Sequence, residues 1–337
     1  MTEGSGRAVV TGAGGFIGHH LVSYLKRQGF WVRGVDLKHP EYAATEADEF
    51  LVLDLRSSEN CLEATRDVDD VYALAADMGG MGFISRYHAR ILHNNILIST
   101  HTLEAAHRNR VRRYLFSSSA CVYPDYRQEE TQVVPLKEED AYPAQPQDAY
   151  GWEKLVTERL CRHYHDEFGM QTRVVRFHNI FGPLGTWDGG REKAPAALCR
   201  KLALAKLRND PVIEIWGDGE QTRSFCYVDD CVQGIHRLMD SNYAEPLNLG
   251  QDRLVTINEL VDIIAEIAGI QVVKKHIPGP QGVRGRNSDN TRLKRVLNWE
   301  PRVSLEAGLA RTYAWIEEQV QARIQSHDAA VQARQAG

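Results

Sequence analysis

The sequence lacks any apolar run near the roughly 18 residues that a membrane-spanning helix needs. It also lacks an excess of positive charge, because 40 lysines and arginines stand against 45 aspartates and glutamates and give a formal net charge of −5 at pH 7. Neither nucleic acid nor an anionic membrane surface is therefore expected as a partner. The segment from Met1 to Gly6 is polar, so a secretory signal is not expected either.

Closely spaced cysteines are missing as well. The six cysteines are scattered and form no CxxC pair. This pattern fits free thiols in a reducing cytoplasm better than disulfides or a structural zinc, and no metal site is expected. What is present is ordinary for a soluble globular protein: 337 residues, 43% hydrophobic and 25% charged, enough for one large or two ordinary domains.

The most informative stretch is the glycine-rich segment Thr11–Gly18. It follows the apolar run Ala8–Val10 and precedes a helical apolar pattern, and Gly12, Gly15 and Gly18 have a GxxGxxG spacing. In a dinucleotide site such glycines allow a sharp turn, a close approach of backbone to the pyrophosphate, and tight helix–strand packing. The phosphates then lie at a helix N-terminus, where free N–H groups favour anions. The alternative is a tight turn without a ligand.

Strands and helices alternate from Arg7 to Phe181. The predicted strands are Arg7–Thr11, Trp31–Val35, Phe50–Leu53, Asp70–Leu74, Arg112–Ser117 and Thr172–Arg176. Helices are predicted over Ile17–Arg27 and His93–Arg108 and from about Asp148 onward. This order predicts an α/β fold with a doubly wound parallel Rossmann sheet, whose ligands bind at the carboxyl ends of the strands.

Two aspartates follow predicted strands at this edge. Asp36 lies 18 residues beyond Gly18, where a carboxylate is expected to meet the ribose hydroxyls, and it favours NAD over NADP although Lys38 is near. Asp54, after the third strand, is a candidate for the adenine edge. Either aspartate could instead be a solvated residue at a strand end.

In the second part of the chain, strands and helices no longer alternate regularly. Predicted elements are the helix Ala194–Arg208, the strand Val212–Trp216, a further sheet unit formed by the strand Phe225–Val228 and the helix Asp230–Met239, and the helices Ile257–Ala268 and Leu305–Gln319. We expect a cofactor-binding domain of residues 1–180 plus about 224–249. A smaller interleaved C-terminal α/β substrate domain would comprise about 181–223 plus 250–320. Residues 321–337 are expected to form a disordered polar tail.

A tyrosine and a lysine share one helix face. Tyr150 and Lys154 are four residues apart, so their side chains project on the same side. A tyrosine hydroxyl is a poor base at pH 7, but a lysine cation beside a positively charged nicotinamide would favour the phenolate. Ser119, after the preceding strand, could hydrogen-bond the same substrate oxygen. A Tyr/Lys pair at this spacing also arises by chance, but the glycine turn and the serine run upstream favour a hydride-transfer site.

These features together resemble the extended short-chain dehydrogenase/reductase superfamily, the NAD-dependent epimerases and dehydratases. A finer pattern resembles the GDP-mannose 3,5-epimerase family from about residue 7 to 320. It comprises the segments Ala75–Phe83, Ser118–Cys121, Arg176–Ile180, Gly189–Pro195, Trp216–Gly219, Gln221–Ser224 and Pro278–Asn290. The polar tail and the segment Leu202–Pro211 depart from the family pattern.

The resemblance implies a cytoplasmic NAD-dependent epimerase. It would invert carbons 3 and 5 of GDP-mannose through a transient 4-ketone, giving GDP-L-galactose, with GDP-L-gulose from inversion at carbon 5 alone. Cys121 and Lys193 are the family's acid–base pair, and a thiolate or desolvated lysine has a tunable pKa. NAD would stay bound through the cycle. The superfamily also implies a homodimer formed by the helix His93–Arg108 and the helix of Tyr150.

The expected site residues form three groups. The catalytic set is Tyr150, Lys154, Ser119, Cys121 and Lys193. The expected NAD contacts are Gly12, Gly15, Phe16, Ile17, Gly18, Asp36, Asp54, Leu55, Tyr150 and Lys154. The expected substrate contacts are Gly79, Ser119, Ala120, Cys121, Asn179, Glu192, Lys193, Ala194, Lys201, Gln221, Thr222, Arg223 and Arg286.

Alternatives remain for several of these residues. Arg223 and Arg286 are interpreted as diphosphate ligands, because guanidinium matches phosphate oxygens bidentately, but they could be surface ion pairs. A free cysteine is usually a packed thiol, but the position of Cys121 two residues after Ser119 favours a place in the active site. Taken alone, Lys193 could be a surface lysine, and His178 is expected to be packed or to line the cofactor site. Other candidate functions are a nucleotide-sugar 4-epimerase, a 4,6-dehydratase and a non-catalytic NAD-binding protein. A dehydratase typically has an acid pair just after the serine run, where this chain has Ala120 and Cys121.

Overall fold

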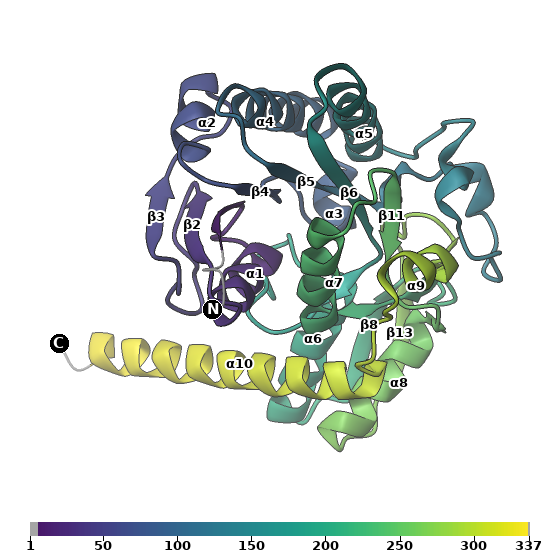
Figure 1. Cartoon of the computed structure of the whole chain (residues 1–337). Helices are drawn as coiled ribbons and strands as arrows, with labels where there is room; N and C mark the ends of the chain where they lie inside the picture. Colours follow the sequence, from purple (N-terminus) through teal and green to yellow (C-terminus); the bar gives the residue numbers. More distant parts are fainter. Residues whose placement is uncertain (1–5, 336–337) are drawn as a thin grey trace.

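A seven-stranded parallel sheet forms the centre of the fold. The computed structural model describes the backbone of residues 6–335 and the side chains of residues 6–326. The sheet has the order β3-β2-β1-β4-β5-β6-β11, and every neighbouring pair is parallel (Figure 1). Its strands are β1 (Arg7–Thr11), β2 (Trp31–Asp36), β3 (Glu49–Val52), β4 (Asp70–Ala73), β5 (Arg113–Ser119), β6 (Gln171–Phe177) and β11 (Pro246–Leu249). The doubly wound parallel sheet predicted from the sequence is thereby confirmed, with its order reversing between β1 and β4.

Helices cover both faces of the sheet (Figure 1). One layer consists of α2 (Ser58–Ala64), α4 (His88–Arg108) and α5 (Ala149–Phe168), and the other contains α1 (Phe16–Arg27) and α7 (Val228–Asp240). Successive strand residues point to opposite faces, so Val9 belongs to the core under α2, α4 and α5 while Val10 belongs to the core under α1 and α7. Burial on both faces explains why the inner strands are apolar throughout instead of alternating.

The rest of the chain packs beside this sheet. Its helices are α6 (Ala194–Arg208), α8 (Ile257–Ala268), α9 (Thr291–Leu297) and α10 (Leu305–Gln335), and α3 (Met81–Ile84) follows β4. Its small sheets are formed by β8 (Val212–Trp216) with β13 (Val273–Ile277), by β12 (Leu254–Thr256), β9 (Thr222–Ser224) and β14 (Gly285–Arg286), and by β7 (Ile180–Phe181) with β10 (Cys226–Tyr227). Three short 3-10 turns are η1 (Ala120–Val122), η2 (Asp125–Arg127) and η3 (Glu138–Ala141).

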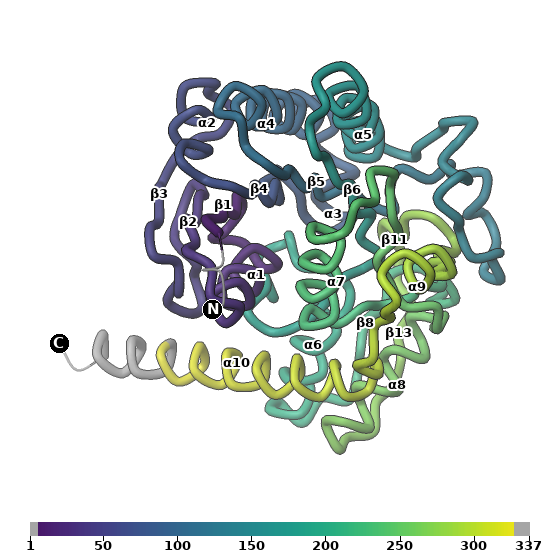
Figure 2. The backbone as a smooth tube through the Cα atoms, viewed as in Figure 1, coloured from purple at the N-terminus to yellow at the C-terminus, as the bar shows by residue number. Residues whose placement is uncertain are grey.

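The two parts are interwoven along the chain. After β7 the chain enters the smaller part, returns through α7 to β11 in the main sheet, and leaves again through α8, as the tube in Figure 2 shows. The core under α1 and α7 continues into α6, α8 and α10 without a break. The predicted domain boundaries remain a prediction.

The structure differs from the sequence prediction at three elements. The predicted strand Phe225–Val228 is β10, which pairs with β7 outside the main sheet, and β11 supplies the additional sheet strand. The proline and asparagine of β11 obscured the strand pattern of that segment in the sequence. Helix α4 begins at His88 instead of His93. Helix α10 continues to Gln335, through most of the segment expected to be a disordered tail, because alanine, glutamine and arginine are good helix formers.

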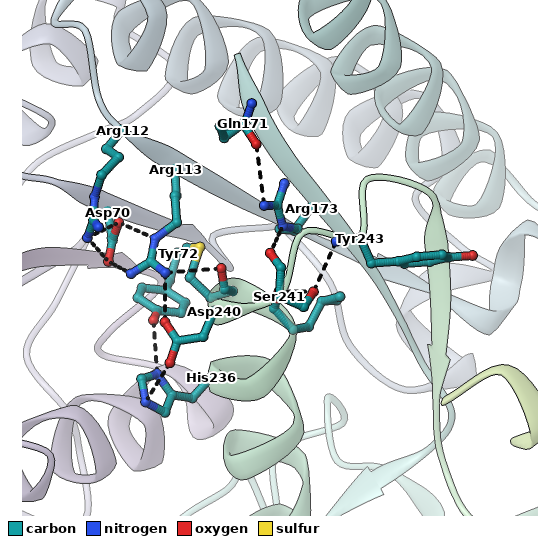
Figure 3. Close-up of polar contacts among 12 residues, drawn as sticks. Asp70, Tyr72, Arg112, Arg113, Gln171, Arg173, His236, Asp240, Ser241 and Tyr243 are labelled. Carbon is teal, nitrogen blue, oxygen red and sulfur yellow. Dashed lines mark hydrogen bonds and ion pairs between the residues drawn. The ribbon is translucent and has the colours of Figure 1, made fainter. Parts of the chain in front are cut away.

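A polar cluster joins the amino ends of the sheet strands to the end of α7 (Figure 3). Asp70, the first residue of β4, accepts hydrogen bonds from Arg113 at 2.8 and 2.5 Å, and Arg113 also contacts Asp240 at 2.7 Å. Arg173 donates to the Ser241 carbonyl at 2.8 Å. Because Asp70 is fully buried, its pairing with arginine is required to offset the cost of desolvation. The cluster fixes α7 at the edge opposite the one where ligands bind.

No helix within residues 6–335 is both long enough and apolar enough to span a membrane.

Candidate active site

A cavity of about 900 Å³ lies along the carboxyl ends of the sheet strands. It brings together most of the residues predicted from the sequence. These are Gly12, Gly15, Phe16, Ile17, Gly18, Asp36, Asp54, Leu55, Gly79, Ser119, Ala120, Cys121, Tyr150, Asn179, Glu192, Lys193, Ala194, Lys201, Gln221, Arg223 and Arg286. Two of the predicted residues, Lys154 and Thr222, do not line the cavity but are buried behind its wall. Lys154 is 1% exposed, and the Thr222 hydroxyl donates a hydrogen bond to the Thr131 carbonyl.

The glycine turn between β1 and α1 can adopt its tight shape only because side chains are absent. Gly12 has φ +73°, and a Cβ there would lie 2.9 Å from the Ala75 backbone nitrogen. A Cβ on Gly18 would lie 2.1 Å from the Gly12 carbonyl oxygen. Helix α1 starts after Gly15 with no side-chain cap and no acidic residue in its first turn. Its N-terminus therefore favours an anion, as a pyrophosphate requires.

The two strand-end aspartates differ in their surroundings. Asp36 accepts hydrogen bonds from the backbone N–H groups of Gly14 at 2.9 Å and Leu37 at 2.6 Å. Burial raises its pKa, and these hydrogen bonds oppose that shift. Asp54 pairs with Arg56 at 2.5 Å, and this pairing lowers the pKa of Asp54. Asp36 thus faces the turn, whereas the Asp54 carboxylate already has a guanidinium partner.

Tyr150 and Lys154 do face the same region. The Lys154 ammonium lies 5.3 Å from the Tyr150 ring centroid and 4.6 Å from the Phe116 ring centroid. Its other neighbour is the fully buried Glu153, at 3.7 Å. Burial raises the pKa of Tyr150 well above its usual value, Cys121 raises it further, and a hydrogen bond with Ser119 lowers it. In the protein alone, desolvation therefore outweighs the influence expected from the lysine.

Close packing of α5 positions Tyr150 beside Cys121. A Cβ on Gly151 would lie 2.1 Å from the Cys121 carbonyl oxygen, so only glycine allows this approach. Deeper in the helix, Glu158 binds Arg176 at 2.8 and 2.6 Å and accepts from the Ser118 hydroxyl at 2.5 Å. This buried network ties α5 to β5 and β6 and fixes the height of Tyr150 above the sheet edge.

Cys121 and Lys193 come from different parts of the chain. Cys121 lies in η1, directly after β5, and its N–H donates to the Ser119 hydroxyl at 3.2 Å. Lys193 precedes α6, and its exposed surface borders the cavity. The surrounding protein removes enough water that desolvation lowers the pKa of Lys193, while Cys121 raises it. The thiol and the amine are thus electrostatically coupled.

Two arginines complete this end of the cavity. Arg286 donates from Nη1 to the Cys121 sulfur at 3.4 Å and from Nε to the Gln128 side-chain oxygen at 2.6 Å. Arg223 donates to the carbonyls of Thr222 and Val283, both at 2.7 Å. Burial, and then Arg286, lower the pKa of Arg223, whereas Cys121 raises it. Positive charge therefore gathers around the thiol.

Three more of the predicted substrate residues line the same cavity. Asn179 adopts φ +48° and donates to the Ser224 carbonyl at 2.8 Å, and Lys201 donates to the Glu214 carbonyl at 2.6 Å. Gln221 donates to the Trp216 carbonyl, while its side-chain oxygen is buried without a hydrogen-bond partner. That oxygen is a free acceptor at the cavity wall.

His178 is packed, as expected. It is fully buried, contacts Asn248 at 3.0 Å, and burial lowers its pKa to about 3. It is therefore neutral and unsuited to proton transfer near pH 7.

An ion pair that the sequence did not reveal joins two walls of the cavity. Asp77, in the loop after β4, pairs with Arg191 at 3.3 Å, and the N–H of Gly80 donates to the Arg191 carbonyl at 3.0 Å. Because Arg191 is two residues before Lys193, these contacts hold the lysine over the cavity. The position of Asp77 in the loop after a strand could have indicated a role at the site. Nothing in the sequence around Arg191 indicated that it pairs with Asp77.

Residues 6–326 contain no group of three or more His, Cys, Asp and Glu side chains placed to hold a metal ion.

Comparison with known proteins gives consistent results. Residues 8–250 match the NAD dependent epimerase/dehydratase family. The chain is 51% identical to GDP-mannose 3,5-epimerase of Arabidopsis thaliana, over 93% of this chain and 82% of that protein. The crystal structure of UDP-glucose 4-epimerase from Thermotoga maritima, with UDP-glucose, has a TM-score of 0.84 at 29% identity, covering 93% of this chain and 99% of that one. UDP-glucuronic acid 4-epimerase from Bacillus cereus, with UDP-glucuronic acid and NAD, has a TM-score of 0.78 at 26% identity, covering the same shares of the two chains.

Proposed function

Because the chain belongs to the NAD dependent epimerase/dehydratase family, we propose that it inverts carbons 3 and 5 of GDP-mannose to give GDP-L-galactose, with GDP-L-gulose from inversion at carbon 5 alone. The observation that carries this proposal is the convergence of Tyr150, Cys121 and Lys193 on one cavity. The 51% identity to a GDP-mannose 3,5-epimerase supports the choice of substrate.

The residues around the glycine turn fit a tightly held NAD. The N-terminus of α1 would receive the pyrophosphate, and Asp36 would accept hydrogen bonds from the adenosine ribose. When bound, NAD supplies the acceptor and donor of hydride at carbon 4 of the hexose. The protein's own contribution is to orient the sugar and to move protons.

Tyr150 is the proton acceptor for the hydroxyl at carbon 4. Burial holds it in the neutral form in the protein alone, so its activation requires positive charge close to the ring. The Lys154 ammonium supplies part of that charge from behind the cavity wall. Ser119, which hydrogen-bonds Tyr150, would hold the same substrate oxygen.

Cys121 and Lys193 carry out the inversions. Once carbon 4 is a ketone, the protons on carbons 3 and 5 are alpha to a carbonyl and acidic. Inversion needs one group to remove a proton and another to return one to the opposite face. A thiol on η1 and an amine before α6 approach the cavity from separate elements, as this requires. A simple 4-epimerase would leave both groups without a task.

The surface of α4 and α5 supports a homodimer. Trp152 and Val156 lie one turn apart on α5 and are 43% and 51% exposed, and Leu92 on α4 is 38% exposed. Large apolar side chains in such a patch favour burial against a second copy. We place the protein in the cytoplasm, because all six cysteines are free thiols.

Product analysis with GDP-mannose and a panel of UDP-sugars tests the activity. The expected result is formation of GDP-L-galactose and GDP-L-gulose from GDP-mannose and no turnover of the UDP-sugars. Cys121→Ala is expected to abolish both inversions while transient NADH absorbance near 340 nm, the cofactor's usual signal, still appears on addition of GDP-mannose. Turnover of a UDP-sugar in place of GDP-mannose would refute the substrate assignment, and normal epimerisation by the variant would remove Cys121 from the mechanism.

A further inference from the structure

A buried glutamine outside the cavity wall contacts the arginine that faces the reactive thiol. Gln128 is 1% exposed and directly follows the turn η2. Its side-chain oxygen accepts the 2.6 Å hydrogen bond from Nε of Arg286, and Nη1 of the same guanidinium donates to the Cys121 sulfur at 3.4 Å. The three side chains therefore form a continuous chain of contacts from the protein interior to the cavity.

Gln128 is itself held in place on every side. Its side-chain nitrogen donates to the carbonyls of Tyr123 and Pro124 at 3.1 and 3.0 Å. Its own carbonyl accepts from the N–H groups of Arg284 and Gly285 at 2.8 and 3.1 Å. The side-chain nitrogen thus binds the loop that follows Cys121, and the oxygen remains to fix the guanidinium of Arg286 in β14.

The direction of this guanidinium matters for the thiol. The charged and titratable groups that act on Cys121 are Arg286 from β14, Arg223 from β9, Lys193 before α6 and Tyr150 from α5. Among these, Arg286 makes the hydrogen bond to the sulfur itself. A cation that donates to sulfur favours the thiolate, which is the form that can remove a proton from carbon.

We propose that Gln128 is a positioning residue: by accepting the Arg286 Nε hydrogen bond, it directs the opposite side of the guanidinium at the Cys121 sulfur and keeps that thiol ready for proton transfer. The proposal rests on the proposed function, in which the thiolate takes a proton from a carbon next to the 4-ketone and becomes a thiol. Gln128 acts only through Arg286 and does not touch the substrate.

Alkylation of the native protein by iodoacetamide tests this without substrate. The other five cysteines are buried, so alkylation of the folded chain, located by mass spectrometry, reports on Cys121. Gln128→Met removes the acceptor for Arg286 at nearly constant volume. The pH at which the alkylation rate reaches half its maximum should rise by about one unit, and alkylation at pH 7 should slow about tenfold. Epimerase kcat at pH 7 should fall by a similar factor with little change in KM.

The double variant with Arg286→Met separates positioning from loop packing. If Gln128 acts only through Arg286, Gln128→Met should add nothing to the shift of Arg286→Met, whereas lost packing of the loop would add a shift of its own. If Gln128→Met does not fold, Gln128→Asn, whose shorter amide cannot span the distance to Arg286, replaces it.

Two results would overturn the proposal: an unchanged alkylation profile in Gln128→Met, or a further shift when Gln128→Met is added to Arg286→Met. If the profiles shift as expected but the wild-type protein does not epimerise GDP-mannose, the positioning role stands and the proposed function fails.

Discussion

Burial and a negative charge on Cys121 shift the pKa of Tyr150 in the same direction but shift the pKa of Lys193 in opposite directions. Desolvation raises the pKa of Tyr150 and lowers that of Lys193, so burial alone favours the neutral form of both. A negative charge on Cys121 would raise both pKa values, which stabilises the lysine cation and disfavours the phenolate. Proton transfers at these three residues are therefore interdependent, and a change at the thiol alters the other two.

The buried histidine next to this site gives a prediction about pH. Burial lowers the pKa of His178 from 6.5 to about 3. Between these values the unfolded chain binds a proton that the folded chain does not, so the free energy of unfolding falls as the pH is lowered through 6.5. From pH 7 to pH 5 this group should cost about 2 kcal/mol of stability.

His178→Gln should lose that part of the pH dependence. Urea unfolding at pH 7, 6 and 5 measures the difference in slope, and His163→Gln at an exposed position is the matched control, with no change expected. A wild-type slope in His178→Gln would show that the buried histidine is protonated in the folded state.

At the scale of elements, the turn before α1 requires glycine at position 12 for two separate reasons. Gly12 needs a left-handed backbone conformation, and its missing Cβ also keeps the turn close to the loop that follows β4. Gly269 after α8 has a similar φ of +68°, yet a Cβ there would meet no atom within 4 Å. A comparison of substitutions at these two glycines therefore separates the effect of backbone strain from the effect on the shape of the turn that binds the cofactor.

Both Gly12→Ala and Gly269→Ala should destabilise the protein by about 1–2 kcal/mol through strain at positive φ. Only Gly12→Ala should also lose bound NAD, because its Cβ would displace Ala75 at the cavity wall. The measurement is the NAD content of purified protein after acid release, beside thermal unfolding of each variant. Retention of NAD by Gly12→Ala would contradict the assignment of this turn.

Across the whole molecule, the sheet could be predicted from the sequence, whereas the contacts that complete the site from distant parts of the chain could not. The order of apolar runs and glycines sufficed for β1, β2, β4, β5 and β6, because each strand is continuous in sequence and buried on both faces. The separate strand β11 was hidden by Pro246 and Asn248. Periodicity cannot reveal contacts such as Asp77 with Arg191, which join positions more than a hundred residues apart. Lys193 emerged only from family resemblance, whereas Cys121 was also indicated by its position two residues after Ser119.

Assembly is a second property of the whole molecule. We expect the protein to sediment at twice the 38.0 kDa mass of one chain. Trp152→Glu combined with Val156→Glu on α5 should yield the monomer mass, because two charges would be buried in the interface. Val273→Glu, on β13 and 60% exposed in the wild-type chain, is the control and should remain dimeric. A monomeric wild-type protein, or a dimeric double variant, would exclude this interface.

In the proposed reaction, one cavity moves protons at two carbons of the same sugar. Incubation of the protein with GDP-mannose in heavy water, followed by NMR of the nucleotide sugars, tests it most directly. We expect solvent deuterium to enter at carbons 3 and 5 and at no other carbon of the hexose. Product formed without deuterium at these two carbons would contradict it.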